Sequence, residues 1–208
     1  SRNFGTVSQF KRDMMAEVAA TLAFSTIENN DKVGVIFFSD KIELFIPPKK
    51  GKTHVLRIIR QLLSFEPEST GTDINLALEY LTNAIKRHCT AFLISDCLDT
   101  AFTAPPVKRS TTIPLMVAAN RHDISVIQVY DKRDTYMPNI GLVQVRDAET
   151  GQRLWADTAM ASVRNAYREQ WQTNQRNLQS LLTKTGTRNV SVATDGDYVK
   201  ALMSLFKQ

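Results

Sequence analysis

Three short, mainly apolar runs separated by longer amphipathic segments restrict the folds that this chain can adopt. The runs span residues 33–38, 91–95 and 124–130. Each has the length of a β-strand and lacks a regular polar and apolar alternation, as is typical of strands covered on both faces. The segments around them carry apolar residues at helical spacing. This alternation predicts an α/β protein with a doubly wound, mostly parallel sheet.

The helical segments have recognisable ends. We expect helices over residues 7–27, 53–63, 73 to about 87, a short one ending near 120, 159 to about 185, and 197–206. Thr72 or Asp73 can cap the third of these, and Asp157 can cap the long one. Gly186 ends the long helix.

Two further segments predict hairpins. Residues 42–46 return directly after the first strand, and Pro47 and Pro48 then end the segment, which favours an antiparallel strand at the rim of the sheet. Residues 142–146 and 153–156 flank a turn that contains Gly151, so a protruding hairpin is expected over about 141–157. A last short strand is expected at residues 190–193.

Composition narrows the class of protein. The chain has 208 residues, of which 43% are hydrophobic and 23% charged, and this suits one globular domain over 1–208. Its apolar stretches, such as residues 33–38, are far shorter than a membrane span, and the first dozen residues do not resemble a signal peptide. We therefore expect a cytoplasmic protein without a membrane span.

Charge and cysteine content add two expectations. The 26 Lys and Arg exceed the 21 Asp and Glu only slightly and are spread along the chain, so nucleic acid is not an expected partner. Cys89 and Cys97 lie on either side of a predicted strand, too far apart for a disulfide bond. Both are expected to be free thiols.

Candidate site residues follow the predicted strands directly. In an open parallel sheet, ligands bind beyond the carboxyl ends of the strands, where this chain has Asp40, Asp96 and Asp131. Asp40 has an ordinary role in a turn between two strands. Asp96 instead ends a central strand, and a carboxylate there, joined by hydroxyl groups, suits Mg²⁺.

Seven sequence blocks in a fixed order carry a family resemblance. They are Ser-x-x-Phe-Gly-Thr at 1–6, VGVIFFSD at 33–40, IPPKKG at 46–51, TDINLAL at 72–78, FLISD at 92–96, RHDI at 121–124 and DAETG at 147–151. Together they resemble the bacterial family known as domain of unknown function 58, which is similar to the von Willebrand factor type A fold. The resemblance implies a three-layer, Rossmann-like domain with one antiparallel edge strand.

The resemblance also implies a metal-ion-dependent adhesion site. Domains of this kind bind Mg²⁺ (or Mn²⁺ or Ca²⁺) through an Asp-x-Ser-x-Ser motif after the first strand, a Thr and an Asp. By resemblance, Ser1 matches the last Ser of the motif, Thr72 the Thr and Asp96 the Asp. The Asp and first Ser of the motif, and the first central strand that carries them, are then expected upstream of Ser1, so that the domain is incomplete at its N-terminus.

Three functions remain open at this stage. The first is a non-enzymatic protein-interaction module that binds a partner through the metal ion; the resemblance implies an adaptor for a MoxR-type AAA+ ATPase. The second is an enzyme for Mg²⁺-dependent phosphoryl transfer or hydrolysis that uses Asp96, although no Gly-rich phosphate loop is present. The third is a metal-free scaffold that binds through the hairpin, where Trp155 is a candidate contact, and the long helix. Thr72 could equally be only a helix cap, and Ser1 only a terminal residue.

Overall fold

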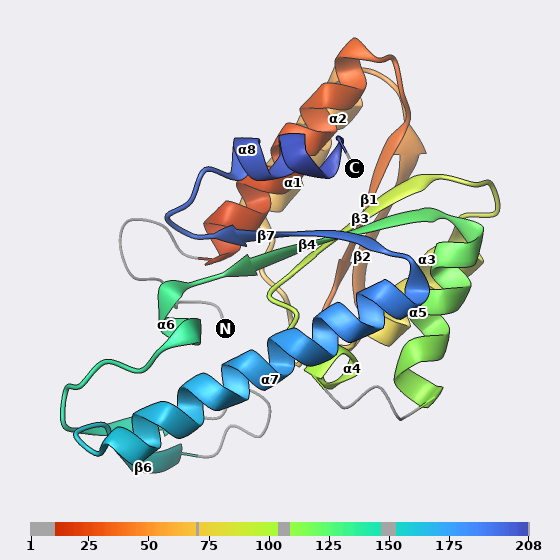
Figure 1. The fold of residues 1–208 in the computed structure, drawn as a ribbon. Coiled ribbons are helices and arrows are strands. Elements are labelled where there is room, and N and C mark those ends of the chain that lie inside the picture. Colours follow the sequence, from red (N-terminus) through yellow and green to blue (C-terminus); the bar gives the residue numbers. More distant parts are fainter. Residues whose placement is uncertain (1–10, 70, 104–108, 147–152, 208) are drawn as a thin grey trace.

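The computed structural model describes residues 11–69, 71–103, 109–146 and 153–207, which form a mixed α/β fold (Figure 1). The helices in these ranges are α1 (Lys11–Glu28), α2 (Lys52–Ser64), α3 (Ile74–Ala84), α4 (Thr100–Thr103), α5 (Arg109–Arg121), α6 (Lys132–Thr135), α7 (Ala161–Thr185) and α8 (Tyr198–Leu205). The strands are β1 (Val33–Phe38), β2 (Ile42–Lys49), β3 (Thr90–Ser95), β4 (Asp123–Tyr130), β5 (Leu142–Arg146), β6 (Arg153–Asp157) and β7 (Arg188–Ala193).

A parallel sheet forms the centre of the molecule. Its strand order is β3-β4-β7, with Leu93 opposite Val126 and Ile127 opposite Val190. β4 lies between the other two strands and is buried along most of its length. The prediction of parallel strands covered on both faces is confirmed for this sheet.

Helices cover both faces of the parallel sheet. On one face, Leu93 and Val126 pack against α3, α5 and α7, and Leu115 at the centre of this cluster is fully buried. On the other face, Ile127 and Val129 pack against α1 and α8. Because neighbouring residues of a strand point to opposite faces, the single apolar run of β4 supplies both cores.

β1 and β2 form an antiparallel pair, as predicted from the sequence, but among the described residues this pair is a sheet of its own and not the rim of the parallel sheet. The predicted end of β2 is wrong, because the strand continues through Pro47 and Pro48 to Lys49. The register slips beside Gly34, where an added Cβ would lie only 2.7 Å from the Ile46 carbonyl oxygen. An irregular edge pairing leaves backbone positions that need no N–H donor, and prolines are tolerated there.

The helix α3 packs against both the β1-β2 pair and the parallel sheet, although the described strands of the two sheets do not pair with each other. Among the described residues, β1 is hydrogen-bonded to β2 alone, and β3 to β4 alone. α3 lies over both, since its apolar residues join the core of β3 and β4 while Tyr80 packs edge-on against Phe45 of β2. One edge of β1 and one edge of β3 are therefore left without a strand partner in the described part of the chain.

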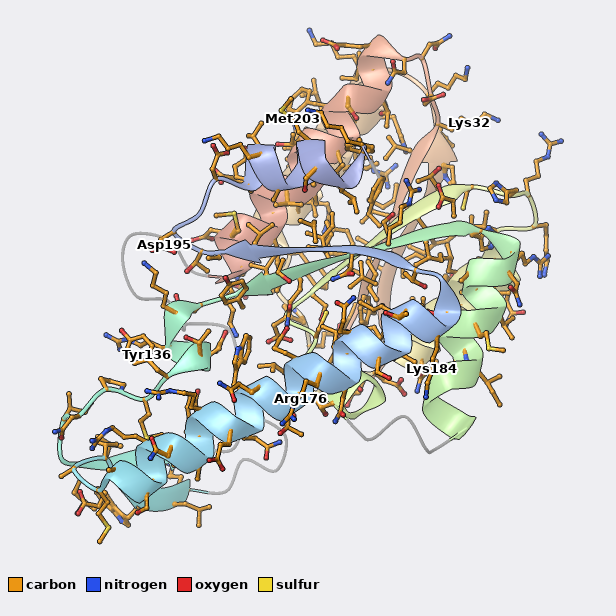
Figure 2. The ribbon with its side chains drawn as sticks, viewed as in Figure 1. Lys32, Tyr136, Arg176, Lys184, Asp195 and Met203 are labelled. Carbon is orange, nitrogen blue, oxygen red and sulfur yellow. The ribbon has the colours of Figure 1, made fainter. Side chains whose placement is uncertain are left out.

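The predicted hairpin is present as β5 and β6, which pair in antiparallel register. It lies beside the N-terminal end of α7, away from the central sheet (Figure 1). α7 then runs back along the molecule, with Arg176 partway along it and Lys184 near its C-terminal end (Figure 2). Gly186 ends this helix in a left-handed conformation, as predicted.

Several helix ends differ from the sequence predictions. Met160, and not Asp157, is the N-cap of α7; the Asp157 carboxylate instead accepts a hydrogen bond from the backbone of Ala159. α3 ends at Ala84, where Ile85 becomes extended, and not near residue 87. Leu63 continues the apolar spacing of α2 but is exposed. The short helices α4 and α6 were not predicted. No helix in the described ranges is both long and apolar enough to cross a membrane.

Candidate functional site

The carboxyl ends of the parallel strands form one edge with polar side chains. Because β3, β4 and β7 run in the same direction, Asp96, Asp131 and Thr194 follow them at the same edge of the sheet. Asp131 is fully buried and accepts a hydrogen bond from the Thr194 hydroxyl at 2.7 Å. This edge contains Asp96 and Asp131, two of the three strand-end carboxylates that the sequence pattern singled out.

A sharp turn presents Asp96. Cys97, which follows it, has a left-handed backbone with φ 56°, and its N–H donates to the Ser95 hydroxyl at 3.1 Å. A residue other than glycine adopts this conformation only where the surroundings hold it. Asp96 Oδ1 accepts from the backbone of Leu98 at 3.3 Å, while its carbonyl oxygen lies 3.4 Å from the Gln128 amide nitrogen. The turn therefore fixes the Asp96 carboxylate with its side chain 24% exposed.

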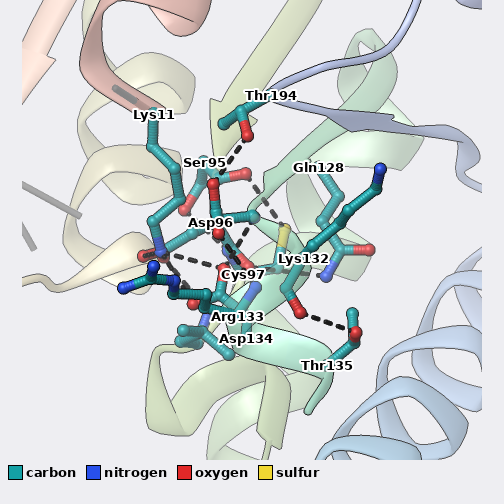
Figure 3. A network of polar contacts seen from close by, with 12 residues as sticks. Lys11, Ser95, Asp96, Cys97, Gln128, Lys132, Arg133, Asp134, Thr135 and Thr194 are labelled. Carbon is teal, nitrogen blue, oxygen red and sulfur yellow. Dashed lines mark hydrogen bonds and ion pairs between the residues drawn. The ribbon is translucent and has the colours of Figure 1, made fainter. Parts of the chain in front are cut away.

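A buried lysine lies against that carboxylate. Lys11 Nζ is 3.4 Å from Asp96 Oδ2 and 3.1 Å from Asp134 Oδ2, and its side chain is only 3% exposed (Figure 3). Sequence analysis missed Lys11 and Asp134. A lysine in the first turn of an amphipathic helix has the local pattern of a solvated residue, so no signal along the chain distinguished it.

Asp134 belongs to α6, which follows β4 along the chain and contacts the first residue of α1, Lys11. Its Oδ2 accepts the Asp131 N–H at 2.8 Å, and Asp131 in turn accepts the Arg133 N–H at 2.9 Å. The Asp131 side chain also accepts from the Asp134 backbone, and this reciprocal pair of bonds between Asp131 and Asp134 forms a capping box. α6 is also held to α7, since the Tyr167 hydroxyl donates to the Arg133 carbonyl oxygen at 2.9 Å.

The Thr72 segment reaches the same edge. The Asp73 N–H donates to the Ser39 carbonyl oxygen at 2.9 Å, and the Ile74 N–H donates to Asp99 Oδ2 at 3.2 Å. The segment thus lies between the end of β1 and the turn that follows Asp96. Thr72 is exposed, while Asp73 is the residue that caps α3 by accepting the Leu76 N–H.

Glu43 holds the loop that leads to Thr72. Its carboxylate accepts the Ser39 hydroxyl at 2.7 Å and the backbone N–H groups of Glu68 and Ser69 at 3.1 and 3.2 Å. The Ser39 hydrogen bond is the main cause of a lowered pKa for the Glu43 carboxyl. Sequence reasoning missed this role, because it depends on a loop more than 20 residues away in the chain.

The side chains at this edge can be compared with what a Mg²⁺ site requires. Within the described ranges, no three His, Cys, Asp or Glu side chains are arranged to hold a metal ion. Mg²⁺ does not require such a group, since it uses one or two carboxylates together with hydroxyls and waters. The positive charge that lies beside Asp96 and Asp134 in the structure is the Lys11 ammonium. The donor chemistry of Asp96 and Thr72 therefore fits Mg²⁺, whereas Ser1 lies outside the described residues.

A thiol and an imidazole meet at the other edge of the sheet. Cys89 Sγ lies 3.4 Å from His122 Nδ1, before β3 and β4 begin. His122 is 1% exposed, its Nε2 has no hydrogen-bond partner among the described residues, and burial lowers its pKa. Both cysteines are free thiols, as predicted, and burial raises the pKa of the Cys89 thiol. His122 is buried and Cys89 half-buried, and both pKa shifts favour the uncharged forms.

The hairpin carries exposed apolar side chains. Trp155 is 66% exposed, which agrees with the expectation from the sequence. Other large apolar side chains that are mainly exposed on or beside the hairpin are Ile140, Leu142, Leu154 and Met160. We call these five residues the hairpin patch. The sequence-predicted turn at Gly151 lies outside the described residues.

Fold and geometry together define the class: an α/β protein with a central parallel sheet and polar side chains at the carboxyl ends of its strands. The chain belongs to the family described as "Protein of unknown function DUF58", whose model matches residues 1–177. The resemblance noted from the sequence blocks is confirmed at the level of this family.

Similar sequences occur in mycobacteria. Proteins of Mycobacterium bovis and Mycobacterium tuberculosis, each named only as uncharacterized, are 28% identical over 153 residues, which is 73% of this chain and 46% of each relative. The chain therefore spans about half the length of these relatives. A protein of Mycobacterium avium is 25% identical over 78% of this chain and 92% of its own length.

Two solved structures share the fold. One is the conserved hypothetical protein BatB from Bacteroides thetaiotaomicron, with a TM-score of 0.59 and 17% identity over 94% of this chain and 86% of that protein. The other is an aerotolerance-related membrane protein from Bacteroides fragilis, with a TM-score of 0.54 and 15% identity over 93% of this chain and 89% of that protein. At these identities the similarity concerns the fold.

Proposed function

We propose that this protein is a non-enzymatic interaction module that binds an acidic residue of a partner protein through a divalent cation. The observation that carries the proposal is the hydrogen bond from the Ile74 backbone to the Asp99 carboxylate, which brings the Thr72 segment onto the turn beside Asp96. Carboxylate and hydroxyl oxygens from separate loops then lie at one edge of the sheet. Such an arrangement suits a cation with an open coordination position.

The proposed fold is a complete von Willebrand factor type A domain. It includes one more strand between β1 and β3, carried by residues upstream of Ser1. Two features support this. β1 and β3 each have one edge without a strand partner in the described part of the chain, and α3 spans both sheets. An added strand would pair with both edges and satisfy their backbone groups.

The proposed ligands are Ser1, Thr72 and Asp96, with the remaining positions filled by the upstream part of the motif, by water and by the partner's carboxylate. Mg²⁺ is the expected ion, with Mn²⁺ or Ca²⁺ as alternatives. The proposed partner is a MoxR-type AAA+ ATPase, and the proposed location is the cytoplasm. The partner rests on the family resemblance alone.

Calorimetric titration of Mg²⁺ and Mn²⁺ tests the metal site. The full natural polypeptide that contains this sequence is compared with its Asp96→Ala and Thr72→Ala variants. Binding heat that disappears in both variants supports the proposal. Asp31→Ala is the matched control, because it removes an exposed carboxylate that precedes β1 at the other end of the strand. Binding that is unchanged in both site variants refutes it.

A binding assay with a purified MoxR-type ATPase tests the partner. The expected result is capture by the wild type in Mg²⁺, and loss of capture on chelation or in Asp96→Ala. An interaction that persists in both conditions points to the third function, a metal-free scaffold. The hairpin patch favours that alternative, because large apolar side chains left exposed, Trp155 among them, are typical of contact surfaces. Trp155→Ala would then abolish capture.

The enzymatic alternative has its own test. Hydrolysis of p-nitrophenyl phosphate that requires both Mg²⁺ and Asp96 would replace the interaction module by a phosphoryl-transfer enzyme. Asp96 follows a parallel strand, which is a position that such enzymes use for a metal-binding carboxylate. Absence of turnover leaves the interaction module as the preferred function.

A further inference from the structure

We propose that the buried ammonium of Lys11 regulates the metal site as a built-in competitor: Lys11 and a divalent cation alternate at Asp96, and cation binding leaves Lys11 with Asp134 alone. This inference rests on the proposed function, since it requires a cation site at Asp96. It adds a residue that no sequence motif indicated.

The first support is the burial of the lysine. Its side chain is 3% exposed, and its Nζ lies between the carboxylates of Asp96 and Asp134. A charged group is withdrawn from water this completely only when opposite charges compensate for the lost hydration. The carboxylates of Asp96 and Asp134 therefore hold the Lys11 ammonium at this edge.

The second support is the asymmetry of the two contacts. Asp134 is the nearer partner, at 3.1 Å against 3.4 Å for Asp96, and its side chain is 9% exposed against 24%. Asp134 is also fixed by the Asp131 N–H. Asp96 is thus the more solvent-accessible and the more weakly engaged carboxylate. An incoming cation reaches Asp96 first and can displace the longer contact.

The third support is the use of the two oxygens of Asp96. Oδ1 accepts the Leu98 N–H, and Oδ2 faces the ammonium of Lys11. A dication bound to Oδ2 would lie within a few ångströms of the ammonium. Like charges at that separation repel strongly in a partly buried site. Binding of the dication therefore favours movement of Lys11 away from Asp96, toward Asp134.

Two substitutions separate competition from simple positioning. In Lys11→Met the competing charge is gone, so a cation should bind more tightly. In Asp134→Asn the lysine loses its stronger partner and is left to Asp96, so a cation should bind more weakly. If Lys11 merely held Asp96 in place for the metal, removal of the lysine would weaken binding. The two models thus predict opposite signs for Lys11→Met.

The experiment is a calorimetric titration of Mn²⁺ into the full natural polypeptide. We expect Lys11→Met to tighten binding by at least about tenfold and Asp134→Asn to weaken it by about threefold or more. Lys200→Met, which removes an 85% exposed lysine on α8, is the matched control and should leave the affinity unchanged. Near-UV circular dichroism verifies that each variant is folded.

The possible outcomes distinguish failure of the Lys11 competition from failure of the proposed metal-binding function. Equal or weaker binding by folded Lys11→Met overturns the competition while the metal site stands. Should Lys11→Met not fold, Asp134→Asn decides, and an unchanged or higher affinity overturns the inference. If the wild type and every variant fail to bind Mn²⁺, the proposed function fails and the inference with it. Binding by Lys11→Met alone supports the competition.

Discussion

Replacement of Lys11 by Met should destabilise the fold through the charge that it leaves behind. The substitution keeps an unbranched apolar side chain but removes the ammonium beside Asp134, whose own side chain is 9% exposed. Loss of one partner from a fully buried ion pair costs about 3–5 kcal/mol. Asp96 is 24% exposed and can be rehydrated, so we expect a loss of about 2–4 kcal/mol here.

Urea unfolding followed by circular dichroism measures this loss. With a slope on the order of 2–3 kcal/mol/M, the midpoint should fall by about 0.7–2 M. The double variant Lys11→Met with Asp134→Asn should lose less than the sum of the two single variants, by about 1 kcal/mol or more, because the stranded charge is gone. Additive losses, or a midpoint that does not move in Lys11→Met, would show that the ion pair contributes little.

Three further predictions concern other parts of the molecule. Leu115→Ala empties a fully buried position, so we expect a loss of about 3–5 kcal/mol by urea unfolding; a loss below about 1 kcal/mol would contradict the assigned core. The hydrogen bond from the Ser39 hydroxyl is the first cause of the lowered pKa of the Glu43 carboxyl. The folding stability that this carboxylate contributes is therefore fully present above its unfolded pKa of about 4.3, and it is lost as the pH falls through the lower folded pKa. Wild type should therefore lose more stability than Glu43→Gln on acidification below about pH 4, and parallel curves would refute the role. Burial raises the pKa of the Cys97 thiol well above its usual value. In the variant Cys89→Ser, where Cys97 is the remaining cysteine, this thiol should react with Ellman's reagent at pH 8 only as the protein unfolds. Rapid reaction of Cys97 in the folded protein would contradict this prediction.

Local sequence patterns determined much of the fold. The apolar run at Val33–Phe38 predicted β1 with its observed bounds, and the short return after it predicted an antiparallel partner. Asp73 and Gly186 marked helix ends because capping depends on the chemistry of a few neighbouring residues. Such signals involve contacts close in the sequence, and they can be read without knowledge of the tertiary structure.

Predictions failed where tertiary contacts override local preference. Pro47 and Pro48 were expected to end β2, yet the edge position of the strand and its irregular register let it continue. Leu63 fits the apolar stripe of α2 but is 69% exposed, because whether a helical position is buried depends on which elements pack against the helix. Neither outcome is encoded in the segment itself.

The residues of the candidate site also divide into those that the sequence indicated and those that only the tertiary structure revealed. The sequence singled out Asp96 through its place after a strand, and it suggested Thr72 by family resemblance. Only the tertiary structure placed Lys11 beside Asp96 and Asp134, which are 85 and 123 positions away from it in the chain. The physical reason is that the burial of a charge depends on the whole packed environment, whereas the sequence around Lys11 records only the periodicity of one helix.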